Sequence, residues 1–130
     1  MSKRLNISTG VKWEDIVGYS RAVRVGNRII VSGTTSIVNG EIEGKGDYYI
    51  QTKTILSKIE KVLNEAGSKL GDVVRTRIYV KDISKWENVG RAHGEYFGKI
   101  KPASSMIGIA SLVDPEMLVE IEAEAVTDQD

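Results

Sequence analysis

The chain contains no cysteine and only one histidine, His93. Without cysteine there can be no disulfide framework, no thiolate nucleophile and no thiolate metal ligand. A lone histidine also falls short of the usual zinc sites, which combine several histidine, cysteine or carboxylate ligands. We therefore expect neither a metal site nor a cofactor.

The sequence has no excess of positive or negative charge. It also has no long apolar run. Its 18 Lys and Arg balance 18 Asp and Glu, so the net charge at pH 7 is zero. A neutral chain gives no electrostatic reason to expect nucleic acid or an anionic membrane as a partner. The N-terminus has no signal-peptide pattern, and no run of about eighteen apolar residues occurs. These absences predict a soluble, cytoplasmic protein.

The composition itself is that of an ordinary globular protein. Over 130 residues, 41% are hydrophobic and 28% are charged. That length suits one domain spanning residues 1–130, which can bury a core without disulfides or metals.

The C-terminal part of the chain predicts two strands with one acidic face. Residues 119–125 alternate, so that Glu120, Glu122 and Glu124 share one face and small or apolar residues share the other. Residues 103–111 alternate in the same way. Carboxylates in register on one sheet face repel one another unless cations or a partner chain neutralise them. We therefore expect something other than water on this face.

Earlier segments predict further strands and turns. Residues 19–33 read as a hairpin around a Gly-Asn turn, and the Asn-Gly pair at 39–40 marks a second tight turn. The first 16 residues are weakly patterned, with Trp13 as the expected anchor. Residues 73–80 form a strand that places on one face Val74, Thr76, Ile78 and Val80, and on the other Arg75, Arg77 and Tyr79.

Two segments have the helical period instead. The first begins with Asp47 as N-cap and ends near Gly67, and Lys58 belongs to its expected solvated face. The second begins with a capping-box pattern at 84–87 and ends at Gly98. Its predicted apolar stripe comprises Trp86, Val89, His93 and Phe97.

The order of elements is strand, strand, helix, strand, helix, strand, strand. It predicts an α+β fold in which two helices cover one face of a mixed sheet. The uncovered face would carry ordered Arg, Glu, Tyr and Met side chains, which indicates association with copies of the same chain.

Several motifs, in order and at the right spacing between Gly18 and Val126, resemble the YjgF/YER057c/UK114 family. This family is also called the Rid, or reactive-intermediate (imine) deaminase, family and carries the label endoribonuclease L-PSP. The motifs are GYSRAVRVGN, IIVSGTT, NEAG, DVVRTRIYVKDI, EYFG and PAS followed by VEIEAEA.

The resemblance implies a chorismate-mutase-like fold and a homotrimer whose sheets enclose a central barrel. Clefts between the subunits would bind small metabolites. In members that deaminate enamines and imines, an arginine two positions after the proline of a P-A-R motif holds the substrate carboxylate. A glutamate in the terminal V-E-I-E run places the attacking water.

Carried over by residue, the resemblance makes Glu120 the catalytic glutamate. Tyr19 matches the aromatic residue at the start of the first strand, and Ser32 and Gly33 match the pair that lines the cleft. These positions predict a site that binds a small molecule.

Two further positions in the predicted cleft depart from the family. Ser104 stands at the arginine position, and Met106 stands where the family often has cysteine. Loss of the guanidinium removes a charge-assisted contact of about 1.5 to 3 kcal/mol. The chain therefore resembles an arginine-lacking branch. Either Arg75 or Arg77 would then contact an anionic ligand, or both would neutralise the acidic row.

Three function classes remain open at this stage. The first is a 2-iminobutanoate/2-iminopropanoate deaminase-like hydrolase that uses Glu120. The second is a non-catalytic metabolite-binding or regulatory trimer, in which Glu120 is a structural acceptor and Ser104 a packing residue. The third, endoribonuclease or translation inhibitor, is the weakest, since the chain has neither a basic nor an aromatic platform for RNA. His93 is expected to be a satisfied core or interface histidine.

Overall fold

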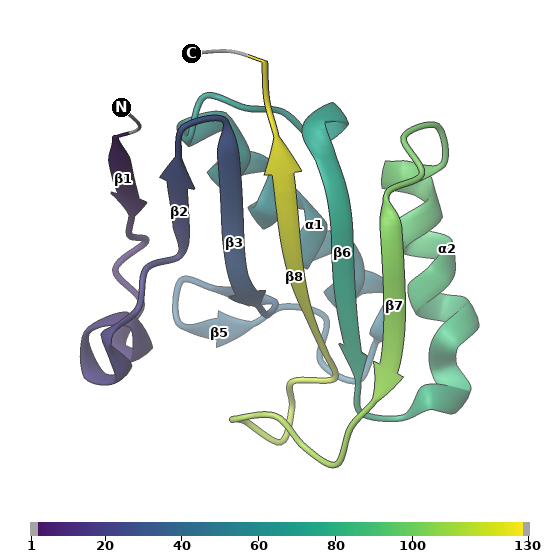
Figure 1. Ribbon diagram of the computed structural model, residues 1–130. Coiled ribbons are helices and arrows are strands. Elements are labelled where there is room, and N and C mark those ends of the chain that lie inside the picture. The colour runs from purple at the N-terminus through teal and green to yellow at the C-terminus, as the bar shows by residue number, and fades with distance from the viewer. Residues whose placement is uncertain (1–2, 129–130) are drawn as a thin grey trace.

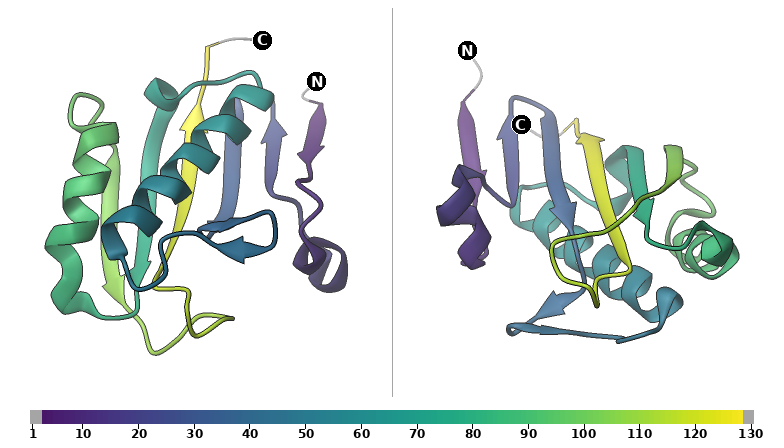
Figure 2. Two further views of the ribbon diagram at one scale, coloured as in Figure 1. Left: turned by 180° about the vertical axis from the view of Figure 1, so that it is seen from behind. Right: turned by 90° about the horizontal axis from the view of Figure 1, so that it is seen from below.

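The computed structural model describes residues 3–128. Two α-helices pack side by side on one face of a six-stranded sheet and leave the other face open (Figures 1 and 2). This arrangement confirms the predicted α+β class with two helices on one face. The elements are β1 (Arg4–Ile7), β2 (Ala22–Val25), β3 (Arg28–Thr34), β4 (Ile37–Val38), β5 (Glu41–Ile42), α1 (Tyr48–Glu65), β6 (Val73–Val80), α2 (Trp86–Phe97), β7 (Ala103–Gly108) and β8 (Val119–Val126).

The sheet is mixed, with the order β1-β2-β3-β8-β6-β7. Among the strands of residues 3–128, only β6 and β7 run parallel, and they are joined through α2, because a parallel pair requires a crossover. The last strand of the chain, β8, therefore lies in the middle of the sheet between β3 and β6. This position brings residues near the C-terminus beside residues from the N-terminal third of the chain.

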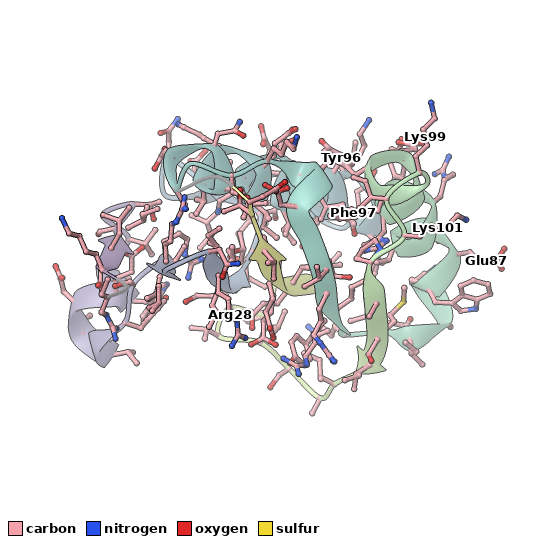
Figure 3. All side chains as sticks on the ribbon, turned by 45° about the horizontal axis from the view of Figure 1, so that its top comes forward. Arg28, Glu87, Tyr96, Phe97, Lys99 and Lys101 are labelled. Atoms are coloured by element: carbon pink, nitrogen blue, oxygen red, sulfur yellow. The ribbon has the colours of Figure 1, made fainter. Side chains whose placement is uncertain are left out.

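The core lies between the sheet and the helices. Ile29 and Ile121 of the sheet, Leu56 and Leu63 of α1 and Phe97 of α2 are each at most 2% exposed. Burial of each such side chain contributes about 1.5 to 3 kcal/mol. Figure 3 shows the helices on one side of the sheet, with Phe97 at the end of α2, and Arg28 extending from the opposite side. The helices thus fix the sheet and leave its second face available.

The predicted ends of the first helix are confirmed. The Oδ1 atom of Asp47 accepts the N–H of Ile50 at 3.0 Å, which caps the N-terminus of α1. At the other end Gly67 has a φ of +81°, and the Ser68 N–H donates to the Leu63 carbonyl at 2.8 Å. This is the Schellman arrangement, which favours glycine.

The predicted start of the second helix is wrong. Asp82, not Ser84, provides the cap, because its Oδ1 accepts both the N–H and the Oγ–H of Ser84. The carboxylate caps a short 3₁₀ turn, Ile83–Lys85, that leads into α2. Trp86 is 55% exposed, so the buried stripe of α2 begins at Val89 instead.

A bulge changes the predicted face of one residue in β6. The pairing of β6 with β8 shifts register between Val73 and Arg75. Val74 is therefore 46% exposed and does not join Thr76 and Ile78 on the buried face. From Arg75 onward the predicted alternation holds.

The N-terminal segment is more ordered than its weak pattern predicts. Residues 4–7 form β1, which pairs antiparallel with β2. Trp13 is only half-buried, and the segment is held instead by Glu14, which is 4% exposed. The Glu14 carboxylate accepts hydrogen bonds from the hydroxyls of Ser8 and Thr9 at 2.7 and 2.8 Å.

Both predicted tight turns are present. Between β2 and β3, Gly26 has a φ of +61°, and between β4 and β5, Asn39 and Gly40 have φ values of 52° and 82°. Such backbone matches the right-handed twist of the strands that flank it. Among residues 3–128, no helix has the length and apolar character needed to cross a membrane.

Candidate functional site

Strand β8 places a row of acids on the open face of the sheet. Glu120, Glu122 and Glu124 alternate with residues whose exposure is at most 2%, such as Ile121 and Ala123. The predicted alternation is thus confirmed. Because β8 is a central strand, the acids face residues of β3 on one side and of β6 on the other.

Two of the three acids of this row, Glu122 and Glu124, have partners within the chain. Glu124 pairs with the guanidinium groups of Arg28 and Arg77, at 3.4 and 3.6 Å. Glu122 accepts a hydrogen bond of 2.6 Å from the Tyr79 hydroxyl, and this bond raises the pKa of Tyr79. Both carboxylates are therefore already occupied.

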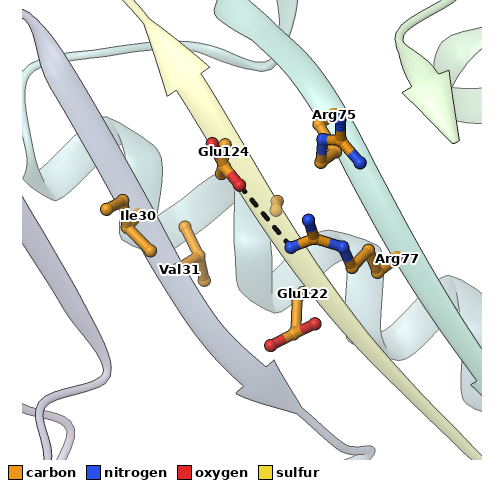
Figure 4. A pocket seen from close by; sticks show the side chains of 7 residues that line it. Ile30, Val31, Arg75, Arg77, Glu122 and Glu124 are labelled. Carbon is orange, nitrogen blue, oxygen red and sulfur yellow. Dashed lines mark ion pairs between the residues drawn. The ribbon is translucent and has the colours of Figure 1, made fainter.

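A shallow hollow lies beside these pairs on the open face. Arg75, Arg77, Glu122, Glu124 and Ile30 contribute to its lining (Figure 4). The interpretation that the two arginines neutralise the acids holds for Arg77, whereas Arg75 forms no ion pair with another residue of 3–128. Whether either arginine contacts a ligand stays a prediction.

Glu120 differs from the other two acids. It is half-buried, and no donor within residues 3–128 forms a hydrogen bond with its carboxylate. Burial raises the pKa of Glu120, the nearby negative charge of Glu122 raises it further, and the charge of Arg21 opposes both. A carboxylate in this state can accept a proton from water, since its oxygens are not engaged.

Gly33 creates the space in which the Glu120 carboxylate lies. The pairing of β3 with β8 is interrupted between Val31 and Thr34, which leaves the backbone of Gly33 close to the carboxylate. A Cβ atom at Gly33 would stand 2.6 Å from Oε2 of Glu120. A larger residue at this position would therefore displace the Glu120 carboxylate, so glycine serves here for space and not for a special backbone angle.

The other predicted cleft residues on this side also come together. The backbone N–H of Ser32 donates to the carbonyl of Arg21, and the Ser32 hydroxyl donates to the Ser20 carbonyl at 2.6 Å. Tyr19 follows a π-helical turn, Glu14–Gly18, and its ring lies 5.5 Å from the guanidinium carbon of Arg21. Tyr19, Ser32 and Gly33 thus cluster around one arginine.

Sequence reasoning missed that arginine. Arg21 is 6% exposed, and its Nη1 donates to the carbonyl of Gly33 at 2.9 Å and to Oγ1 of Thr34 at 3.3 Å. The only signal was a charged residue directly before β2, a strand that itself contains the charged Arg24. Nothing in that pattern indicates that the side chain turns inward.

The prediction that Lys58 lies on a solvated face is also wrong. Its Nζ donates to the carbonyls of Thr35 and Ile37, each at 2.7 Å. Burial lowers the pKa of Lys58 to about 8, and the charge of Arg21 contributes to this change. The amine therefore approaches the Arg21 region from the helix side of the sheet.

Ser104 and Met106 do not join this cluster within one chain. In the parallel pairing with β6 they lie opposite Thr76 and Ile78, which are buried on the helix side, and Met106 packs against the core. Glu120 projects from the other face, two strands away, or about 10 Å across the sheet. A site that includes both Ser104 and Glu120 therefore needs more than one chain.

The Ser104 hydroxyl has neighbours of its own. Oγ1 of Thr76 lies 2.8 Å from the Ser104 Oγ and 2.9 Å from Nε2 of His93. His93 also packs on Phe97, and burial lowers its pKa, which favours the neutral ring. His93 is thus a satisfied histidine, as expected. No group of three potential metal ligands occurs within residues 3–128.

Comparisons with known proteins agree with this architecture. A solved structure of a YjgF/YER057c/UK114 family member from Mycobacterium tuberculosis superimposes with a TM-score of 0.88 and 47% identity, covering 96% of this chain and 100% of that one. A RutC family protein of Pyrococcus abyssi is 40% identical over 81% of this chain and 83% of its own length. The 2-iminobutanoate/2-iminopropanoate deaminase of Escherichia coli K12 is 32% identical over 83% of this chain and 86% of its own.

The family model described as Endoribonuclease L-PSP matches residues 9–127, which include every site residue discussed above. The chain therefore belongs to the endoribonuclease L-PSP family, also called the YjgF/YER057c/UK114 family.

Proposed function

We propose that the protein hydrolyses the C=N bond of small imines, including those formed from enamines, with Glu120 as the general base. The observation that carries this proposal is the half-buried Glu120 carboxylate, which has a raised pKa and no hydrogen-bond donor within residues 3–128. The deaminase named among its relatives supports the same chemistry.

The reaction needs one proton acceptor that later returns the proton. Glu120 accepts a proton from water while the water oxygen bonds to the imine carbon, and the imine nitrogen gains a proton from solvent. The resulting carbinolamine then breaks its C–N bond: the proton from Glu120 passes to the departing nitrogen, and the hydroxyl proton is released to solvent as the C=O bond forms. The products are a carbonyl compound and ammonia. A base with a pKa raised toward neutrality suits both steps.

The proposed site lies between subunits of a homotrimer. The open face has ordered, mixed charges, and within one chain Ser104 and Met106 lie on the opposite face from Glu120. In a trimer with clefts between subunits, Ser104 and Met106 of one subunit would face Glu120, Gly33 and Tyr19 of the next. Size-exclusion chromatography with light scattering tests this arrangement, and a stable monomer would contradict it.

A metabolite-binding trimer without catalysis is the second candidate. It is favoured by Ser104, whose hydroxyl lies in hydrogen-bond contact with Thr76 and supplies no positive charge for a substrate carboxylate. The family label endoribonuclease finds no support in a chain of zero net charge, because RNA binding depends on cationic surfaces.

Ammonia release from amino-acid-derived imines generated in situ separates these candidates. We expect turnover by the native protein and none by Glu120→Gln. Glu124→Gln is the matched control, since that acid belongs to the same row but is already paired with Arg28 and Arg77. Ser104→Arg is expected to increase turnover of imino acids over neutral imines. Saturable binding of a metabolite with no turnover by any variant would establish the second candidate instead.

A further inference from the structure

Arg21 is buried and forms no ion pair with any residue that the structure describes. It is 6% exposed, and no carboxylate among residues 3–128 lies within ion-pair distance of its guanidinium. Its Nη1 donates to Gly33 and Thr34, but the buried Nε has no partner within those residues. A buried cation without a close counter-charge is costly. Such a group indicates a role other than simple packing.

The charges around Arg21 come from several elements. Glu14, in the turn before β2, and Glu120, on β8, are both stabilised in their ionised form by Arg21. Lys58 approaches from α1 and is disfavoured in its charged form by the same guanidinium. Arg21 therefore interacts electrostatically with three titratable groups that belong to separate parts of the chain.

Gly33 links Arg21 to Glu120, because it lies in contact with both side chains. The guanidinium binds the Gly33 carbonyl, and Glu120 lies so close to Gly33 that a Cβ atom there would be 2.8 Å from its carboxyl carbon. The bulge between Val31 and Thr34 leaves this backbone without regular pairing to β8. Arg21 supplies the missing constraint, because its side chain holds both ends of the Gly33–Thr34 link.

We propose that Arg21 is a positioning residue for Glu120. The Arg21 side chain fixes the Gly33 backbone beside the Glu120 carboxylate, and its positive charge offsets the negative charge of Glu122. This inference rests on the proposed function of Glu120. The groups that face Glu120 are Glu122 on its own strand, Tyr79 on β6 and Arg21 before β2. Of these, only Arg21 favours the ionised base.

Titration of Glu120 by carbon NMR of a carboxyl-labelled protein tests the proposal without any substrate. The Glu120 resonance is assigned by its loss in Glu120→Gln. We expect Arg21→Met to move the Glu120 midpoint to higher pH, and Arg21→Lys to bring it back toward the native value. Arg28→Met is the matched control, because Arg28 pairs with Glu124 and its removal should leave the Glu120 midpoint unchanged.

A second variant covers the case in which Arg21→Met does not fold. Arg21→Gln keeps a donor for the Gly33 carbonyl and removes only the charge, so the Glu120 midpoint should still rise. An unchanged midpoint in Arg21→Gln or Arg21→Met would overturn the proposal. Full imine turnover by Glu120→Gln would instead refute the proposed function, and the titration would still report whether Arg21 acts on Glu120.

If both proposals hold, the fall in imine turnover at low pH should follow the protonation of Glu120 measured in the titration. Arg21→Gln should lose activity below neutral pH and recover it as the pH rises, with kcat affected more than KM. Arg21→Lys should restore the native profile in part. A uniform loss at every pH would indicate a purely structural arginine and contradict the positioning role.

Discussion

Glu14 and Glu120 lie near the same buried arginine, and their environments differ in one respect. Glu14 is 4% exposed, and burial would raise its pKa, but hydrogen bonds from Ser8 and Thr9 outweigh burial and lower it. Glu120 is less buried and has no such donors in the described part of the chain, so burial and Glu122 raise its pKa despite Arg21. Local donors, and not depth alone, decide whether a buried carboxylate is held as a structural anion.

The difference also separates stability from chemistry. The Glu14 oxygens are occupied by hydroxyl and backbone donors, which fasten the N-terminal segment to the domain. The Glu120 oxygens are not occupied in this way, so they remain available to a water or substrate. If this interpretation is right, changes at the two glutamates should affect different measurable properties.

The largest expected effect is a loss of stability in Glu14→Ala. The substitution removes the charged acceptor of the Ser8 and Thr9 hydroxyls and a negative charge near Arg21. Loss of hydrogen bonds to a charged group predicts a decrease of about 3 kcal/mol in the free energy of unfolding. Urea denaturation at pH 7 measures it. Asp15→Ala, an exposed neighbour in the same turn, should change stability by less than about 0.5 kcal/mol. Equal effects of the two substitutions would refute the structural role of Glu14.

Gly33→Ala is expected to displace Glu120 and so to reduce imine turnover. The new Cβ atom would lie 2.6 Å from Oε2 of Glu120, so the carboxylate must move. A displacement of this size predicts a decrease of about 10- to 100-fold in imine turnover. Because the end of a flexible side chain can move aside, the protein should still fold. Gly94→Ala on α2, where no atom lies within 4 Å, should keep full turnover and gain about 0.5 to 1 kcal/mol of stability. Native turnover by Gly33→Ala would argue against the placement of Glu120.

The pH dependence of stability should have opposite signs at the two glutamates. The pKa of Glu120 is raised by folding, so its ionisation destabilises the fold, and Glu120→Gln should melt slightly higher than the native protein at pH 7. That gain should vanish as the pH falls below the ordinary glutamate value of 4.5. The pKa of Glu14 is lowered, so the stability that Glu14 contributes is present above 4.5 and is lost on acidification. Melting curves between pH 3 and pH 8 compare the two, and a lower melting point of Glu120→Gln at pH 7 would contradict the assignment.

The smallest expected effect concerns Lys58, whose pKa is also influenced by the charge of Arg21. Lys58 has a pKa lowered to about 8 by burial, so after reductive methylation with labelled formaldehyde its resonance should titrate well below those of exposed lysines such as Lys61. Since the charged amine is disfavoured in the fold, stability should rise slightly as the pH increases through 8. Arg21→Gln should raise the Lys58 midpoint in part. A midpoint equal to that of Lys61 would show that Lys58 is solvated after all.

Local sequence patterns were sufficient for much of the fold. The alternation of β8, the Asp47 cap and the Gly67 stop of α1, and both tight turns follow from side-chain period and backbone preference within a few residues. The exposed position of Val74 and the cap at Asp82 did not follow, because each depends on a competing contact. A bulge in the pairing with β8 turns Val74 outward, and the Asp82 carboxylate, two residues before Ser84, accepts the N–H of Ser84.

For the candidate site, the sequence alone predicted Glu120 and the Ser32-Gly33 pair as site residues, and it identified the family to which these motifs belong. Only the tertiary structure brought Arg21 and Gly33 to Glu120, and only the parallel pairing of β7 separated Ser104 from them. Periodicity determines which residues of one strand share a face. It contains no information on strand order or bulges, and these decide which distant side chains meet.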